Sequence, residues 1–131
     1  MKYLVMIYAN PRNWEHPMFR HNPEFLALPQ EEQDEIVRQA DEMWEEIHRS
    51  GEFVEGVALA DPGLTRNLRG VDGRPVATDG PYLEAKEQLA GYFVLDCESR
   101  ERAAEIAARI PDARFAGIEV RPVMDFSGEE M

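Results

Sequence analysis

The stretch DGPYLEAKEQLAGYFVLD, residues 79–96, decides the fold, because a charged turn in it runs directly into an apolar strand. Residues 88–95 are apolar and aromatic on both faces, which is typical of a strand buried inside a sheet. Before it, Pro81 fixes its own φ and restricts Gly80, so the turn is stiff. Charges beside a buried strand need a partner or a ligand. This junction is therefore the first candidate site.

Other strands are predicted from short apolar stretches along the rest of the chain. They cover residues 2–8, 53–59, 64–68, 76–78 and 118–123. Asp72-Gly73 is a strong turn signal, which predicts that the third and fourth of these strands form a hairpin. Pro122 places the last strand at an edge of the sheet or near its own end, since proline cannot donate to a strand ladder.

Two helices are predicted between the strands. An apolar stripe at spacings of three and four residues indicates a helix over residues 30–50. Pro29 suits its first position and Gly51 its C-terminal cap. Ser99 is a natural N-cap for the second helix, which Pro111 ends.

The order of these elements predicts an α+β fold, a ferredoxin-like protomer with an antiparallel sheet and two helices on one face. Two helices cover one face only, whereas the central strands are apolar on both faces. We therefore expect a second copy of the sheet to cover the other face, which predicts a homodimer. The prediction is a single domain over residues 1–126, followed by a frayed acidic tail at 127–131.

Composition excludes several classes of function. The chain has 131 residues, a net charge of −12 and 44% hydrophobic residues. Because nucleic-acid phosphates and anionic lipid repel such an acidic chain, neither nucleic acid nor membrane is an expected partner. Cys97 alone makes no intrachain disulfide and no multi-cysteine metal site. The absence of a signal peptide and of a long apolar run predicts a cytoplasmic protein.

The segment DGPYLEAKEQLAGY, residues 79–92, resembles the DGPF branch of the YCII-related domain family, and residues 2–8, 107–111 and 117–123 support the match. The resemblance implies a dimeric α+β barrel. Some such proteins resemble small lyases or isomerases that rely on a His–Asp pair. Many look as if they are encoded beside extracytoplasmic-function sigma factors, which implies a regulatory or sensing context. Tyr82 stands where the family usually has Phe and adds a phenol to the pocket wall.

Asp79 is the first candidate catalytic residue. The rigid Gly80-Pro81 turn would hold its carboxylate in a set direction, as a positioned acid, base or acceptor requires. The alternative is that Asp79 accepts backbone N–H groups and merely closes the turn.

Lys86 and Arg121 are the candidate anion-binding residues, a point charge and a planar fork for a substrate carboxylate or phosphate. The alternative is an ion-pair network in which Glu84, Glu87 and Glu119 neutralise both cations. The predicted ligand-binding set is Trp14, Asp79, Gly80, Pro81, Tyr82, Lys86, Glu87 and Arg121.

His16 and His21 lie in a long proline-rich segment, residues 10–28, of a length that is more often functional or mobile than neutral. Their spacing matches no zinc signature, so no metal is predicted. They are either exposed loop residues or general acid–base groups that close over the pocket opposite Asp79, with Trp14 as an apolar wall.

Three hypotheses follow for the function. The first is a protein that binds a small anionic metabolite, with a regulatory role. The second is a lyase or isomerase that uses Asp79 and a loop histidine, with no cofactor, because no phosphate-binding or dinucleotide motif is present. The third is a dimer whose charged cluster is purely architectural.

Overall fold

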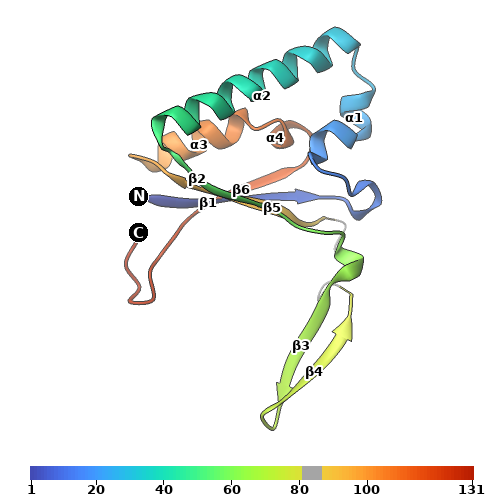
Figure 1. The fold of residues 1–131 in the computed structure, drawn as a ribbon, viewed down its shortest axis with the longest axis vertical. Helices are drawn as coiled ribbons and strands as arrows, with labels where there is room; N and C mark the ends of the chain where they lie inside the picture. Colours follow the sequence, from blue (N-terminus) through green and yellow to red (C-terminus); the bar gives the residue numbers. More distant parts are fainter. Residues whose placement is uncertain (81–86) are drawn as a thin grey trace.

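The computed structural model describes residues 1–80 and 87–131 (Figure 1); of Asn13, Val71, Pro75, Val76 and Thr78 it describes the backbone alone. Four antiparallel strands form one sheet in the order β2-β5-β1-β6. They are β1 (Lys2–Ala9), β2 (Phe53–Ala58), β5 (Gln88–Asp96) and β6 (Gly117–Pro122). This is the strand order of a ferredoxin-like α+β fold, which confirms the predicted class. β6 lies at an edge, as Pro122 indicates.

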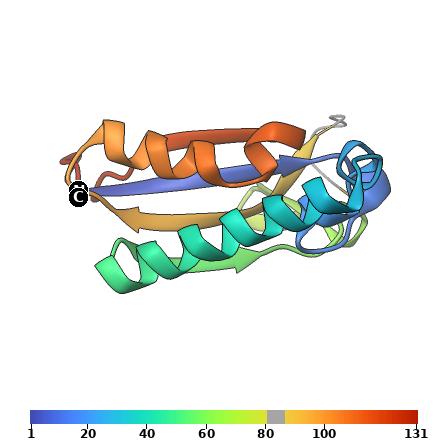
Figure 2. The same ribbon diagram turned by 90° about the horizontal axis from the view of Figure 1, so that it is seen from above.

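Two helices cover one face of the sheet (Figure 2): α2 (Gln30–Ser50) packs over β2, and α3 (Arg100–Arg109) packs over β6 and β1. Gly51 ends α2 in the left-handed region with φ 81°, as predicted. Ser99 caps α3 by accepting a hydrogen bond from the Arg102 N–H at 3.1 Å. The prediction that Pro29 takes the first helical position was one residue early, because the helix begins at Gln30 and Pro29 is its N-cap, with no side-chain hydrogen bond to the helix.

Residues 10–28 contain more regular structure than the sequence indicates. They form the 3₁₀ helices η1 (Pro11–Asn13) and η2 (Met18–His21) and the short helix α1 (Pro23–Leu26). Two asparagines explain this, because Asn10 accepts from Arg12 N–H at 3.0 Å and Asn22 from Glu24 N–H at 2.8 Å. The segment is therefore a capped and folded cover and not an irregular loop.

The core lies between the sheet and the helices. Alternate residues of β1 are buried there, and the packing partners from the helices are Met43, Ile47, Ala103 and Ile106. The other side chains of β1 point to the face that no helix covers and are half-buried. Strands with two apolar faces thus meet helices on only one side.

A hairpin extends from the sheet on its helix-free side (Figure 1). The 3₁₀ helix η3 (Pro62–Leu64) leads into β3 (Arg66–Val71), which pairs with β4 (Arg74–Asp79) in a separate two-stranded sheet. Asp72 and Gly73 form the tip with φ 49° and 75°, the left-handed conformations of a tight hairpin turn. The predicted hairpin is confirmed, with longer strands.

The acidic C-terminal residues fold back along the chain instead of fraying. Met124 bridges Glu130, and Asp125 N–H donates to the Glu129 carbonyl at 2.7 Å. Lys2 N–H donates to the Met131 carbonyl at 2.6 Å and joins this turn to the start of β1. Backbone bonds account for its shape, which hydropathy does not indicate.

Candidate functional site

A cavity of about 610 Å³ lies between α2 and the β2–β5 side of the sheet. Ala40 and Trp44 line it from α2, and Phe53 and Phe93 line it from the sheet. Residues 16–20 and 110–112 close one side. A volume of this size suits a small organic molecule.

Glycine keeps the floor of the cavity open and flat. A Cβ atom at Gly91 would lie 2.4 Å from the Val57 carbonyl oxygen, and one at Gly56 would lie 2.8 Å from the Phe93 ring. Both distances are shorter than van der Waals contact, so a side chain at either position would push β2 and β5 apart or displace the ring. Close strand approach and an aromatic wall thus depend on the same two glycines.

An aromatic cluster forms the apolar wall. The Trp44 ring lies 4.7 Å from Phe93 and 5.7 Å from Phe53, centroid to centroid, with the rings steeply inclined to each other. His48 stacks on the outer side of this cluster, 4.4 Å from the Phe53 ring. Edge-to-face packing fixes the rings, so the wall is pre-formed for a flat apolar ligand.

Asp112 is the buried carboxyl group of the cavity. It begins the short helix α4 (Asp112–Phe115) and is 6% exposed. Burial raises its pKa to about 6, although the N–H groups of Asp112 and Phe19 and the nearby His16 act in the opposite direction. Within residues 1–80 and 87–131, no lysine or arginine forms an ion pair with it. A carboxylate in this condition titrates close to neutral pH.

His16 lies on the same cavity wall and is held by a backbone carbonyl. Its Nε2 is 2.7 Å from the Leu59 oxygen, which also accepts the Trp14 Nε1–H at 3.0 Å. A carbonyl only accepts, so Nε2 carries the proton and Nδ1 is the basic nitrogen of the neutral ring. The imidazole is therefore oriented as a base.

The cavity combines two proton-exchanging groups with apolar walls. Asp112, with a pKa of about 6, is suited to general acid–base work near neutral pH, and the His16 imidazole is a second group that can exchange a proton with a ligand. Arg20 and Asp41 are the other charged lining residues, and they come from η2 and α2. A guanidinium at the wall can bind the carboxylate of a ligand.

Of the residues singled out in the sequence, two come to this site. His16 lines the cavity, and Trp14 shares its carbonyl acceptor. His21 instead lies 3.1 Å from Glu15, both at the surface. Asp79 lies on β4, with its side chain 89% exposed and 3.5 Å from Arg66. The structure does not bring Asp79 and a loop histidine together, and the carboxylate beside His16 is Asp112.

The remaining predicted residues are dispersed. Gly80 has φ 90° and donates its N–H to the Thr65 carbonyl at 2.6 Å, so it closes the base of the hairpin. Arg121 is exposed on β6, opposite Leu4 on β1. Glu87 lines a hollow of about 70 Å³ that Asp112 also lines. Pro81, Tyr82 and Lys86 lie outside the described residues.

Sequence reasoning missed Asp112. Pro111, immediately before it, indicates the end of a helix and gives no indication that the next residue is buried. A usable signal was present, because an apolar helix face that ends in Ile110 continues into the core. The first residue after such a stop can be buried even when it is charged, but only packing decides this.

No group of three or more His, Cys, Asp or Glu side chains able to hold a metal ion occurs among the described residues. In the same part of the chain, no helix is both long and apolar enough to span a membrane.

Comparison with known proteins places this chain in a family. The model of the YCII-related domain matches residues 1–127. An uncharacterized protein of Rhizobium meliloti (strain 1021) is 27% identical over 107 residues, which cover 80% of this chain and 86% of that protein.

Proposed function

Because the chain belongs to the YCII-related family, we propose that it binds a small organic anion in the cavity beneath α2. The observation that carries the proposal is the buried carboxyl group of Asp112 on an aromatic-walled cavity. An ionised carboxylate in such a place lowers the stability of the fold. Groups of this kind concentrate at functional sites.

The lining indicates the chemistry of the ligand. Trp44, Phe53 and Phe93 suit a flat apolar body, and Arg20 suits a carboxylate at one end. Asp112 in its protonated form donates a hydrogen bond, and His16 accepts one through Nδ1. We therefore infer a one-ring aromatic or unsaturated carboxylic acid as the ligand class.

A cofactor-free lyase or isomerase is the second candidate. The presence of His16 and Asp112 in the lining of one cavity favours it, because one group can remove a proton beside a carbonyl while the other returns a proton elsewhere on the same substrate. The pair takes the place of the Asp79–histidine pair expected from the sequence. Cytoplasmic binding with a regulatory role and a link to a sigma factor stays part of the first proposal.

We further propose that the active form is a homodimer. On the helix-free face, Leu4 pairs with Val94 and Met6 with Tyr92, and all four are half-buried in the single chain. Both long helices lie on the other side of the sheet and leave this face uncovered (Figure 1). A second sheet stacked at about 10 Å would bury it.

Tryptophan fluorescence tests the binding proposal. In a Trp14→Phe background, Trp44 on the cavity wall is the one remaining tryptophan of the two in the chain. Titration with benzoate should quench it to saturation. Asp112→Asn should change the dissociation constant by about tenfold, equivalent to about 1.4 kcal/mol. Asp79→Asn is the matched control and should leave it unchanged.

Saturable quenching that responds to Asp79→Asn and not to Asp112→Asn would overturn the assignment of the cavity. The enzyme candidate is tested by incubating the protein with simple 2-oxo acids in D₂O. NMR then monitors the exchange of their carbon-bound protons for deuterium. Exchange that is lost in both His16→Gln and Asp112→Asn supports it, whereas binding without exchange favours the first proposal.

A further inference from the structure

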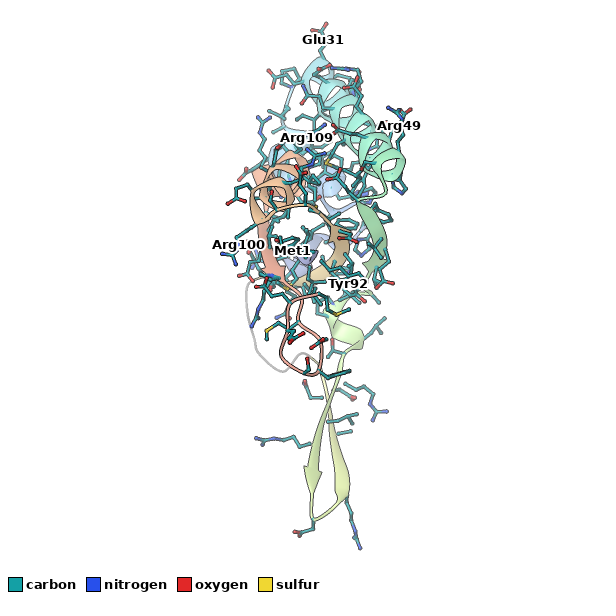
Figure 3. The ribbon with its side chains drawn as sticks, turned by 90° about the vertical axis from the view of Figure 1, so that its left-hand side faces the viewer. Met1, Glu31, Arg49, Tyr92, Arg100 and Arg109 are labelled. Atoms are coloured by element: carbon teal, nitrogen blue, oxygen red, sulfur yellow. The ribbon has the colours of Figure 1, made fainter. Side chains whose placement is uncertain are left out.

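Two segments project from opposite ends of the sheet on its helix-free side (Figures 1 and 3). We call residues 64–80 the arm and residues 124–131 the C-terminal turn. Both carry apolar side chains in solvent: Leu64 and Leu68 are 76% and 69% exposed, and Phe126 is fully exposed. Exposed apolar groups at both ends of an uncovered face indicate a partner surface.

The arm carries three arginines against two aspartates, and two side-chain polar contacts lie within it. Arg66 pairs with Asp79 at 3.5 Å, and Asn67 donates its side-chain amide to the Gly80 carbonyl. Arg69 and Arg74 add two positive charges and Asp72 one negative charge, so the three arginines and two aspartates give the arm a net charge of +1 in a chain whose net charge is −12. A lone two-stranded hairpin is at best marginally stable in water, so the arm is expected to rest on another surface.

The C-terminal turn is acidic and held in shape. Asp125 accepts hydrogen bonds from the Ser127 hydroxyl at 2.5 Å and from the backbone N–H groups of Ser127 at 2.9 Å and Glu129 at 3.1 Å, and these bonds lower its pKa. Glu129 and Glu130 are exposed beside Met124 and Phe126. The turn thus offers negative charge around apolar groups, which is complementary to the arm.

The arm is long enough to reach a second copy. Each of its strands has six residues, which span about 20 Å at roughly 3.3 Å per residue. Sheets packed face to face lie about 10 Å apart. The arm therefore extends past the plane of a sheet stacked on the helix-free face.

We propose that the arm of each protomer docks on the C-terminal turn of a second copy, twice per dimer, about a two-fold axis that runs across the strands. The inference rests on the face-to-face dimer proposed above. Such an axis exchanges the two ends of the sheet, so each arm meets the partner's turn. An axis along the strands would instead bring together two arms that both have a net positive charge, which charge repulsion disfavours.

A pair of charge-reversed chains tests the contact. The first carries glutamate at the three arm arginines, Arg66, Arg69 and Arg74; the second carries lysine at Asp125, Glu129 and Glu130. Each homodimer then contains two like-charged junctions, whereas the mixed dimer contains two complementary junctions. Sedimentation velocity gives the association constants, and circular dichroism verifies that each chain is folded. Arg38→Glu/Arg49→Glu, on the outer face of α2, is the matched control.

The expected result is a wild-type dimer, a dissociation constant raised at least about tenfold in both reversed homodimers, and recovery in the equimolar mixture. A wild-type dimer that neither reversal weakens overturns the arm contact while the dimer stands. Weakening by the arm reversal without any effect of the turn reversal also overturns it. A wild-type chain that stays monomeric at all concentrations overturns the dimer and the arm contact together.

Discussion

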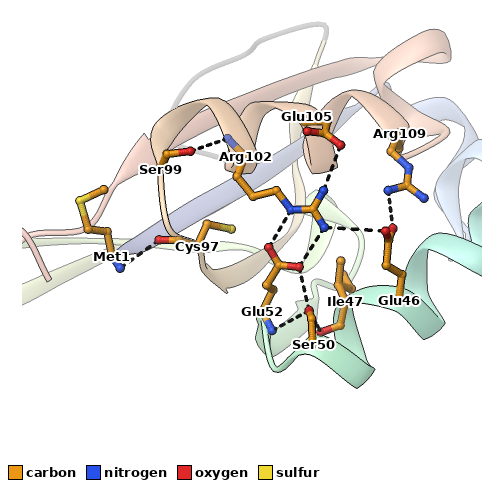
Figure 4. A network of polar contacts seen from close by, with 10 residues as sticks. All are labelled: Met1, Glu46, Ile47, Ser50, Glu52, Cys97, Ser99, Arg102, Glu105 and Arg109. Carbon is orange, nitrogen blue, oxygen red and sulfur yellow. Dashed lines mark hydrogen bonds and ion pairs between the residues drawn. The ribbon is translucent and has the colours of Figure 1, made fainter.

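Two carboxylates beneath the same helical layer have opposite environments. Glu52 lies just beyond the end of α2, where Arg102 donates to it from Nε and Nη2 at 2.8 and 2.9 Å (Figure 4). These bonds lower the pKa of Glu52 to about 2. Asp112 lies at the cavity, where no lysine or arginine of the described part of the chain forms an ion pair with it, and burial raises its pKa to about 6. The same functional group is thus neutralised by a partner in one place and left to titrate in the other.

The difference separates a carboxylate that stabilises the fold, Glu52, from one that is available to a ligand, Asp112. Around Glu52, Ser50 donates its hydroxyl at 2.7 Å, Arg102 also pairs with Glu105 at 3.0 Å, and Arg109 pairs with Glu46. This network joins α2, α3 and the start of β2 and leaves little capacity for a ligand. Asp112 remains able to interact with a ligand, because its pKa is set by burial and not by an ion pair.

Removal of Arg102, the cation that pairs with Glu52, should have the largest effect on the free energy of unfolding. Arg102→Met leaves Glu52 half-buried and unpaired, so we expect a loss of about 3 kcal/mol of unfolding free energy. That is a fall in Tm of roughly 10 °C for a domain of this size. Urea unfolding at pH 7.5 measures it. Arg49→Met removes an exposed pair with Glu45 and should change stability by less than about 0.5 kcal/mol.

Removal of the unpaired charge should have the opposite sign. Asp112→Asn keeps an acceptor for the Phe19 N–H and eliminates the desolvated carboxylate, so the variant should be more stable than wild type by about 2 kcal/mol at pH 8. Thermal unfolding at pH 8 measures this difference. Destabilisation at this pH would contradict the view that Asp112 is maintained for function.

The pH dependence sharpens the contrast further. Because the folded pKa of Asp112 is about 6 and the unfolded pKa about 3.9, its unfavourable contribution appears as pH rises from 4 to 6. The advantage of Asp112→Asn should therefore vanish below about pH 4. Glu52, with a folded pKa of about 2, stabilises above its unfolded value and loses this as pH falls towards 2. At pH 5, in the same series of unfolding measurements, the Glu52→Gln variant should still be less stable than the wild type.

The smallest effect concerns His16. His16 lowers the pKa of Asp112, so His16→Gln should raise that pKa while changing stability by only about 1 kcal/mol, the value of the bond to Leu59. Carbon-13 NMR of the Asp112 carboxyl group measures the shift. An unchanged pKa would mean that the two side chains do not interact.

The fold was largely predictable because its signals are local. Gly51, Ser99 and the Asp72-Gly73 turn each act within a few residues, and all three do what their sequence context indicates. The site was predictable only in part. His16 stood out as one of three histidines, whereas Asp112 is one of 26 acidic residues and its position after an apolar helix face does not by itself show that it is buried.

The sequence by itself therefore determined the order of strands and helices, the hairpin and the apolar pattern of the central strands. Only the tertiary structure decided that Asp112 is the acidic residue buried without an ion-pair partner among the described residues, and that His16 lies on the same cavity wall. The physical reason is range. Periodicity, caps and turns depend on neighbours along the chain, whereas a pKa depends on burial and charges that distant segments bring together.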